Sequence, residues 1–259
     1  MSSPGDKDRG VPGTGGPANP VSGPPGTVLG DISDQQPRPT TVQVAPYLQA
    51  ILDHLSASDP VMARLIDERG PLGITASPQD DYFFTVLDAI ASQQLSSKVA
   101  ATIVNRIRAL VPGEDTPTAE QVFALPDQAL RDVGLSWAKV SYIKDLARRV
   151  VSGELDLVHV SGMSDEEIVK ELVTVKGIGR WTAEMFLLFS LARPDVFAVD
   201  DYGLRVAVKR LYDLPDLPKP APMREIAEPW RPYRSYASLY LWRSLDNSPK
   251  VQAMEVKGS

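Results

Sequence analysis

The chain has 259 residues, a formal net charge of −6 and 43% hydrophobic residues, which allows one large domain or two smaller lobes with a core. The absence of cysteine excludes a disulfide framework and a cysteine-ligated zinc or iron–sulfur site, and His54 and His159 lack a metal-ligand spacing. No stretch is apolar enough to span a membrane, and an acidic chain that binds nucleic acid must use a local basic patch.

The N-terminal segment, residues 1–44, is rich in glycine, proline, serine and aspartate and contains few large apolar side chains. Such a segment cannot bury enough surface to offset its ordering entropy, so we expect a disordered tail. The ordered domain is expected over residues 45–246, followed by a polar tail at 247–259. No apolar core of a signal peptide is present, and we expect a cytoplasmic protein.

Helical spacing of apolar residues predicts a helix from near residue 45, a short helix over 60–67 and a longer pattern from about residue 80 that resumes near 99. The polar stretch 92–97 in that pattern is either a solvated segment or a break between two helices. Thr118 lies in a capping sequence before further short helices. Another amphipathic helix is expected within 134–150.

The segment 172–192 predicts two helices joined by a tight glycine turn. Gly177 and Gly179 can adopt positive φ and permit close backbone approach, and the first amides of the second helix would point outward. With Lys176, Arg180 and Thr182 beside them, these amides could bind phosphate without reading a base. The alternative interpretation is an ordinary C-cap glycine in a helical hairpin.

The helix after the turn is apolar almost all round from residue 182 to 192, which predicts a buried helix, and Trp181 lies in its first turn. Asp200 and Asp201 then open another amphipathic helix, where aspartate caps free amides. The last helix, from about Tyr233, contains aromatic residues at helical spacing, and such residues usually pack in a core.

The hairpin LVTVKGIGRWTAEMF, the later VDDY and the final WRPYRSYASLYLW together resemble the helix-hairpin-helix (HhH-GPD) DNA glycosylase superfamily, and in particular the bacterial 3-methyladenine DNA glycosylase II type. The resemblance covers roughly residues 46–245. It implies an all-α, two-lobed fold with the helix-hairpin-helix motif at the cleft, without the additional β-containing N-terminal domain. It also implies double-stranded DNA with damaged bases as the partner, a monomer, and a nucleoid-associated location.

The same resemblance implies individual roles. Gln94 would fill the gap left by an everted nucleotide, and Leu95 could share that task. Trp181, Trp242 and Tyr202 would form an aromatic base pocket whose ring faces favour an electron-deficient, cationic base. Trp181 occupies the place of the Schiff-base lysine of bifunctional relatives, which implies no strand cleavage.

Alignment from Gly177 favours Asp201 as the catalytic carboxylate, with Asp200 as cap and as the second candidate. An alkylated purine is already cationic and leaves as a neutral base, so one carboxylate beside the oxocarbenium-like transition state can suffice. No cofactor is expected, although hairpin carbonyls could hold a monovalent cation.

Three alternatives remain open. The chain could be a non-catalytic hairpin DNA-binding protein, which needs neither the acidic pair nor Trp181. It could be a glycosylase for another lesion, such as an oxidised or deaminated purine, with lyase activity in the oxidised case. It could also be a scaffold in which the N-terminal tail is the functional part.

Overall fold

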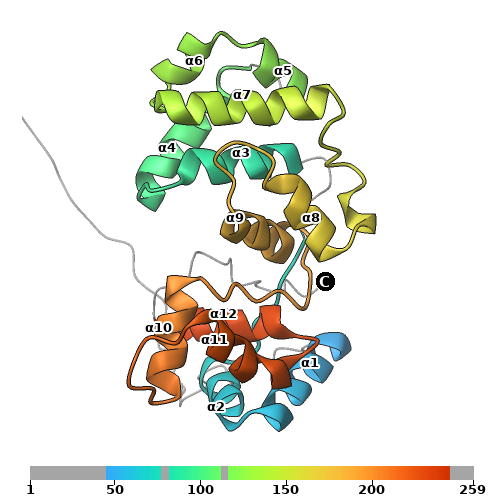
Figure 1. Ribbon diagram of the computed structural model, residues 1–259, viewed down its shortest axis with the longest axis vertical. Coiled ribbons are helices and arrows are strands. Elements are labelled where there is room, and N and C mark those ends of the chain that lie inside the picture. Colours follow the sequence, from blue (N-terminus) through green and yellow to red (C-terminus); the bar gives the residue numbers. More distant parts are fainter. Residues whose placement is uncertain (1–44, 77–81, 112–115, 246–259) are drawn as a thin grey trace, which may run out of the picture. The chain divides into compact units, whose positions relative to one another are not determined.

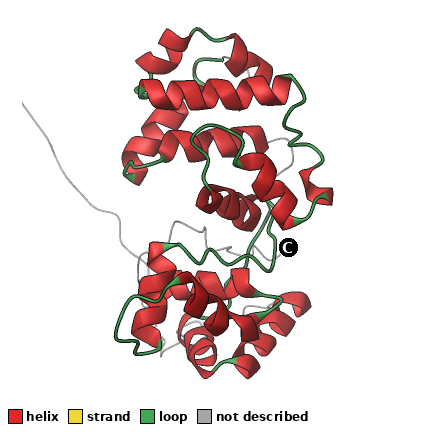
Figure 2. Cartoon of the chain, in the orientation of Figure 1, coloured by secondary structure: helices red, strands yellow, loops and turns green. Residues whose placement is uncertain are grey.

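The computed structural model describes residues 45–76, 82–111 and 116–245, all within the second of two units into which the chain divides, Val42–Ser259. The predicted tails at 1–44 and 247–259 lie outside the described residues. The described residues form helices and loops without a strand (Figure 2), which confirms the all-α prediction. None of the described helices is long and apolar enough to cross a membrane.

The helices are, in order, α1 (Pro46–Ser58), α2 (Pro60–Arg69), α3 (Tyr82–Ser92), α4 (Ser97–Arg108), α5 (Ala119–Ala124), α6 (Asp127–Asp132), α7 (Trp137–Val151), η2 (Val160–Gly162), α8 (Asp165–Leu172), α9 (Arg180–Met185), η3 (Phe186–Ser190), α10 (Tyr202–Leu211), α11 (Pro220–Ala227), η4 (Glu228–Trp230) and α12 (Arg234–Ser244).

These helices pack as two groups within Val42–Ser259 (Figure 1). In the first group, α3 packs on α4 and α7, and α7 also contacts α5 and α6. In the second, α1 and α12 pack on α2, α10 packs on α12, and η4 contacts α1 and α11. The second group therefore combines helices from the beginning and the end of the described chain, and the first group is formed by the sequence between them. This is the predicted two-lobed arrangement.

Helix starts follow their capping residues. Thr118 and Ser164 form capping boxes with Gln121 and Glu167, which confirms the capping start expected near Thr118. The polar stretch 92–97 is a break, since α3 ends at Ser92 and α4 begins at Ser97.

The buried helix predicted over 182–192 is not a regular α-helix along its whole length. It is α-helical only to Met185, and residues 186–190 form the π-helical segment η3, in which the Leu191 amide donates to the Phe186 carbonyl at 3.2 Å. Apolar residues on nearly every side leave no spacing signal from which such a wider turn could be predicted. The prediction of burial is confirmed, because Ala183, Leu187 and Leu188 are buried.

The loop between η3 and α10 is fixed to the start of α12. The Val196 amide donates to Ser235 Oγ at 2.8 Å, and that hydroxyl donates to the Arg193 carbonyl at 2.6 Å. Arg234 Nε donates to Asp195 Oδ1 at 2.6 Å. These bonds hold the backbone that leads to the acidic pair.

The far end of α10 is anchored by a buried carboxylate. Asp59 Oδ2 accepts hydrogen bonds from the Tyr212 hydroxyl at 2.5 Å and from Trp230 Nε1 at 2.9 Å. Asp59 Oδ1 also caps α2 by accepting from the Val61 amide at 2.7 Å. Burial, together with the hydrogen bond to Asp59, raises the pKa of Tyr212 well above its ordinary value. Asp59 thus joins α2, α10 and η4.

Candidate active site

The hairpin between α8 and α9 turns at Gly177, whose φ is +81°. A Cβ at this position would lie 2.2 Å from Cδ2 of Tyr142 on α7. A side chain is therefore excluded both by the backbone conformation and by the tyrosine ring. Gly179, which precedes α9, differs: its φ is −95° and a Cβ there would meet nothing within 4 Å.

The hairpin backbone is also held by a carboxylate of α7. Asp145 Oδ2 accepts from the Lys176 amide at 3.1 Å and from Arg149 Nε at 3.1 Å, and Asp145 Oδ1 pairs with Arg148. Burial alone would raise the pKa of this carboxyl, but the Lys176 amide and the two arginines hold it below its ordinary value. Asp145 is 8% exposed, so it holds the turn from the buried side through the Lys176 amide.

The loop between α3 and α4 is joined to the hairpin. Gln93 Nε2 donates to the Gly177 carbonyl at 2.9 Å. Lys139 Nζ donates to the carbonyls of Ala91 and Gln93 at 2.8 and 2.7 Å, and burial lowers the pKa of this lysine. Sequence reasoning missed Gln93 and Lys139, because a glutamine beside a glutamine and a lysine on an amphipathic helix carry no signal of these contacts.

The two predicted wedge residues lie in this loop. Gln94 is exposed and has a positive φ of 58°, and Leu95 is 37% exposed and lines a pocket described below. The structure thus places the pair next to the hairpin, on a loop fixed by Gln93 and Lys139. The wedge role itself stays a prediction.

The predicted phosphate-binding cations have different surroundings. Arg180 makes a bidentate contact with Glu166 at 3.0 Å and donates from Nε to Glu184 Oε1 at 3.0 Å, and these bonds raise its pKa. Burial raises the pKa of Glu184. Lys176 is exposed and has no ion-pair partner among the described residues. Of the two side chains, Lys176 is the one available to an anion without breaking an ion pair.

Asp201 receives three hydrogen bonds. Its Oδ1 accepts from the Leu204 amide at 2.7 Å and from Trp242 Nε1 at 2.9 Å. Its Oδ2 accepts from Trp181 Nε1 at 2.8 Å. The predicted constellation of Trp181, Trp242 and Asp201 is therefore brought together from α9, α10 and α12, and hydrogen bonds to the ionised form fix the orientation of the carboxylate.

The capping role expected for Asp200 is wrong. Asp201 is the N-cap of α10, while Asp200 is exposed and precedes the cap by one residue. Asp201 Oδ1 both caps the helix and accepts from Trp242, while Oδ2 accepts from Trp181. Tyr202 is 71% exposed, and the described residues give it no ring contact, so it does not close the pocket in this structure.

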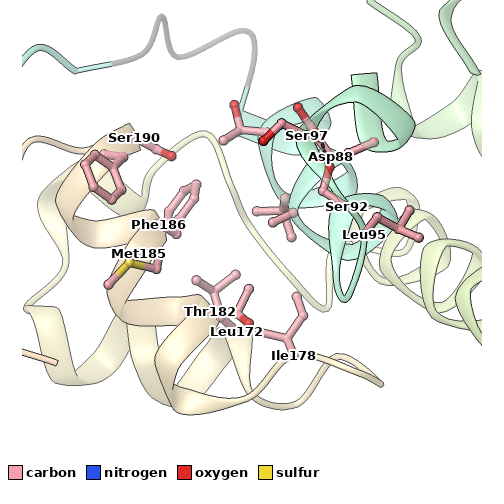
Figure 3. Close-up of a pocket in the computed structure, with 15 residues that line it drawn as sticks. Asp88, Ser92, Leu95, Ser97, Leu172, Ile178, Thr182, Met185, Phe186 and Ser190 are labelled. Carbon is pink, nitrogen blue, oxygen red and sulfur yellow. Dashed lines mark hydrogen bonds between the residues drawn. The ribbon is translucent and has the colours of Figure 1, made fainter. Parts of the chain in front are cut away.

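A pocket of about 580 Å³ lies between the α3–α4 region and the face formed by α9 and η3 (Figure 3). Most of its wall is apolar, with Leu95 on one side and Met185, Phe186 and Phe189 on the other. Thr182, which was predicted to contact a phosphate, is among the residues that line this pocket, and its phosphate role stays a prediction. The Phe189 ring stacks on Trp242 with centroids 5.9 Å apart. The pocket therefore runs from Leu95 of the wedge loop to Phe189, which contacts Trp242, whereas Asp201 and the two tryptophans are not among the residues that line it.

This arrangement can stabilise a developing positive charge. A carboxylate held by three donors keeps its position without reorganisation when a reaction proceeds. Among the described residues no group of three or more histidine and acidic side chains could hold a metal ion. Asp201 with Trp181 and Trp242 offers an oriented carboxylate beside aromatic rings.

Comparisons with known proteins identify the family of this chain. The family model described as "HhH-GPD superfamily base excision DNA repair protein" matches residues 87–232. A putative DNA-3-methyladenine glycosylase of Bacillus subtilis is 36% identical over 207 residues, covering 77% of this chain and 70% of the relative. DNA-3-methyladenine glycosylase 1 of Schizosaccharomyces pombe is 34% identical over 193 residues, covering 74% and 85%. A solved 3-methyladenine DNA glycosylase of the same yeast, in complex with abasic DNA, matches with a TM-score of 0.69 and 32% identity, covering 76% of this chain and 97% of that one.

Proposed function

This chain belongs to the HhH-GPD superfamily of base excision DNA repair proteins, and we propose that it is a monofunctional glycosylase that removes alkylated bases of the 3-methyladenine and 7-methylguanine type from double-stranded DNA. The observation that carries this proposal is the carboxylate of Asp201, which is held by the indoles of Trp181 and Trp242. The names of the relatives support the substrate class.

The reaction needs a negative charge near C1′ of an everted nucleotide. When the bond between C1′ and the base nitrogen breaks, its electron pair leaves with the base and neutralises the positive charge of an alkylated purine. Asp201 stabilises the oxocarbenium-like sugar that remains. At about 4 Å and an effective dielectric constant of ~20, this attraction is worth roughly 4 kcal/mol. Water then adds to C1′, its proton passes to Asp201 or to solvent, and an abasic site remains.

Trp181, whose indole contacts the carboxylate, argues against strand cleavage. Trp181 donates to Asp201 from an indole nitrogen that cannot form a Schiff base with the sugar. A covalent intermediate that leads to β-elimination requires an amine. The chain is therefore proposed to release the base and leave the strand intact.

The hairpin is proposed to hold the DNA backbone. Gly177 lets the backbone turn against the Tyr142 ring, Gly179 leaves open space at the start of α9, and Lys176 adds an exposed positive charge. A monovalent cation bound by hairpin carbonyls could bridge to a phosphate. The Gly177 carbonyl already accepts from Gln93 and the Val175 carbonyl from the Ile178 amide, so such an ion would use their remaining lone pairs or other carbonyls. We further propose that the protein acts as a monomer on nucleoid DNA in the cytoplasm.

The deciding experiment measures base release from methylated duplex DNA under single-turnover conditions. The wild type is compared with Asp201→Asn and Asp200→Asn, and each protein is titrated with DNA that contains an abasic-site analogue. We expect Asp201→Asn to abolish release while retaining DNA binding, and Asp200→Asn to remain active. Loss in Asp200→Asn alone would move the catalytic role by one residue. Binding without release by the folded wild type would favour a non-catalytic hairpin protein or another lesion.

A further inference from the structure

The pocket of about 580 Å³ contains a single ionisable side chain among the residues that line it, Asp88 of α3. The other members are apolar or carry a hydroxyl. Figure 3 shows Asp88 and Ser92 on one wall and Met185 and Phe186 on the opposite one. A lone carboxylate in a mostly apolar wall is costly to desolvate unless a partner compensates its charge. This side chain is not needed for the packing of α3, whose buried face is apolar.

The position of Asp88 is fixed by its own helix. The Ser92 hydroxyl, one turn later, donates to Asp88 Oδ1 at 2.6 Å. No other described residue is hydrogen-bonded to this carboxylate, so Oδ2 is available to a molecule in the pocket. Because α3 packs on both α4 and α7, the carboxylate is mounted on a rigid element.

The pocket lies beside the groups that would act on an everted nucleotide. Leu95 of the wedge loop and Phe189 both line it. The Phe189 ring stacks on Trp242, which in turn donates to Asp201. A base displaced from the duplex past the wedge loop and held near Asp201 therefore has this pocket next to it.

We propose that Asp88 is a specificity-determining residue that favours a positively charged base in this pocket. The inference rests on the proposed glycosylase function and adds a side chain that reads the charge of the base. A cationic alkylated purine would compensate the carboxylate, whereas a neutral base of the same shape would leave it desolvated and unpaired. Charge selection would then arise from Asp88 together with the aromatic faces.

The test uses a matched pair of probes that differ in charge. Binding of the 3,9-dimethyladeninium cation and of neutral 9-methyladenine to the full-length protein is measured by calorimetry. Release of cationic 7-methylguanine and of neutral ethenoadenine from duplex DNA is measured in parallel. The variant Asp88→Asn keeps the shape and the acceptor for Ser92 but removes the charge. Ser92→Ala keeps the charge and removes the hydrogen bond, and Asp53→Asn is the control, because Asp53 is an exposed helical carboxylate that also accepts from a side chain four residues away.

We expect the wild type to prefer the cation. Asp88→Asn should lower that preference by about tenfold, because it removes the attraction between the carboxylate and a positively charged base several ångströms away. Ser92→Ala, which removes the hydrogen bond that orients Asp88, should lower the preference less than Asp88→Asn does, and Asp53→Asn should keep it. Thermal melting should show all variants folded. An unchanged preference in folded Asp88→Asn overturns the inference, even where the wild type releases 7-methylguanine and the proposed function stands. If the wild type releases no base but its binding of the cation depends on Asp88, the inference is supported and the proposed function fails.

Discussion

Trp181 Nε1 lies 2.8 Å from Asp201 Oδ2, so an indole that is 48% exposed is oriented by the carboxylate beside it. The same hydrogen bond restrains the carboxylate from the side of α9, while the Leu204 amide and Trp242 restrain it from α10 and α12. A stacking surface and a charge are thus fixed relative to each other by one contact between residues 20 positions apart in the sequence.

The first prediction follows from this contact. Trp181→Phe keeps an aromatic face but removes the donor to Asp201. A hydrogen bond to a charged group is worth about 1.5–3 kcal/mol, so we expect single-turnover base release to fall by about tenfold or more. Affinity for abasic DNA should change little. The matched control is Trp137→Phe, since Trp137 is 56% exposed and lies at the start of α7. Equal rates for the two variants would show that the indole nitrogen does not position Asp201.

The second prediction concerns the hairpin turn. Gly177→Ala places a Cβ at positive φ and against the Tyr142 ring, so we expect a loss of about 2–5 kcal/mol in the free energy of unfolding and weaker DNA binding. Gly179→Ala, where a Cβ meets open space, should leave the unfolding free energy nearly unchanged. Urea denaturation of both variants measures the difference. Similar destabilisation by the two alanines would contradict the steric argument.

The third prediction concerns the pH dependence of stability. The pKa of Asp145 is lower in the folded protein than its ordinary value of about 3.9, so its contribution is present above that value and is lost as pH falls through the folded pKa. Asp145→Asn should therefore destabilise the protein at pH 7, and its difference from wild type should shrink below pH ~4. Denaturation at pH 7 and at pH ~3 measures this.

Glu184 provides the opposite control, because burial raises its pKa. A carboxyl with a raised pKa costs stability as pH rises through the unfolded value of about 4.3. Glu184→Gln should therefore gain stability relative to wild type between pH ~3 and pH 7. A parallel pH response of the two variants would refute these assignments of direction.

Much of this molecule could be predicted from the sequence, for reasons that differ between its parts. Helices with one apolar face, and starts marked by Thr118 or Ser164, follow from local chemistry. The aromatic and acidic residues of the site could be identified only through the family motif, since a tryptophan before a buried helix otherwise indicates a core position. The structure then added which carboxylate oxygen faces which indole.

Other features depended on contacts between distant residues. Gln93 reaches the Gly177 carbonyl across 84 positions, and Asp145 supports the hairpin from α7. The capping error at Asp200 arose because two adjacent aspartates fit an N-cap equally well in sequence. Hydrogen bonds from Trp181 and Trp242 orient Asp201, and these contacts between distant residues leave no local sequence pattern. The π-helical turn in η3 likewise left no mark in a segment that is apolar on nearly every side.

The last prediction concerns the wedge loop. Leu95 lines the pocket, whereas the exposed Gln94 is free to enter a duplex, so we expect Gln94 to fill the gap left by an everted nucleotide. Gln94→Gly removes this side chain without strain, because a φ of 58° suits glycine better than any other residue. Replacing the stacking of an extruded base is worth a few kcal/mol, so base release should slow by about tenfold or more.

Eversion can be followed separately by the fluorescence of 2-aminopurine placed beside the lesion. Gln94→Gly should lose the fluorescence increase while keeping its melting temperature. Leu95→Ala should retain the increase, since its side chain faces the pocket in the structure. The reverse pattern, with eversion lost in Leu95→Ala and kept in Gln94→Gly, would assign the wedge to Leu95. Because Gln93 holds the same loop to the Gly177 carbonyl, Gln93→Ala should weaken eversion in either case.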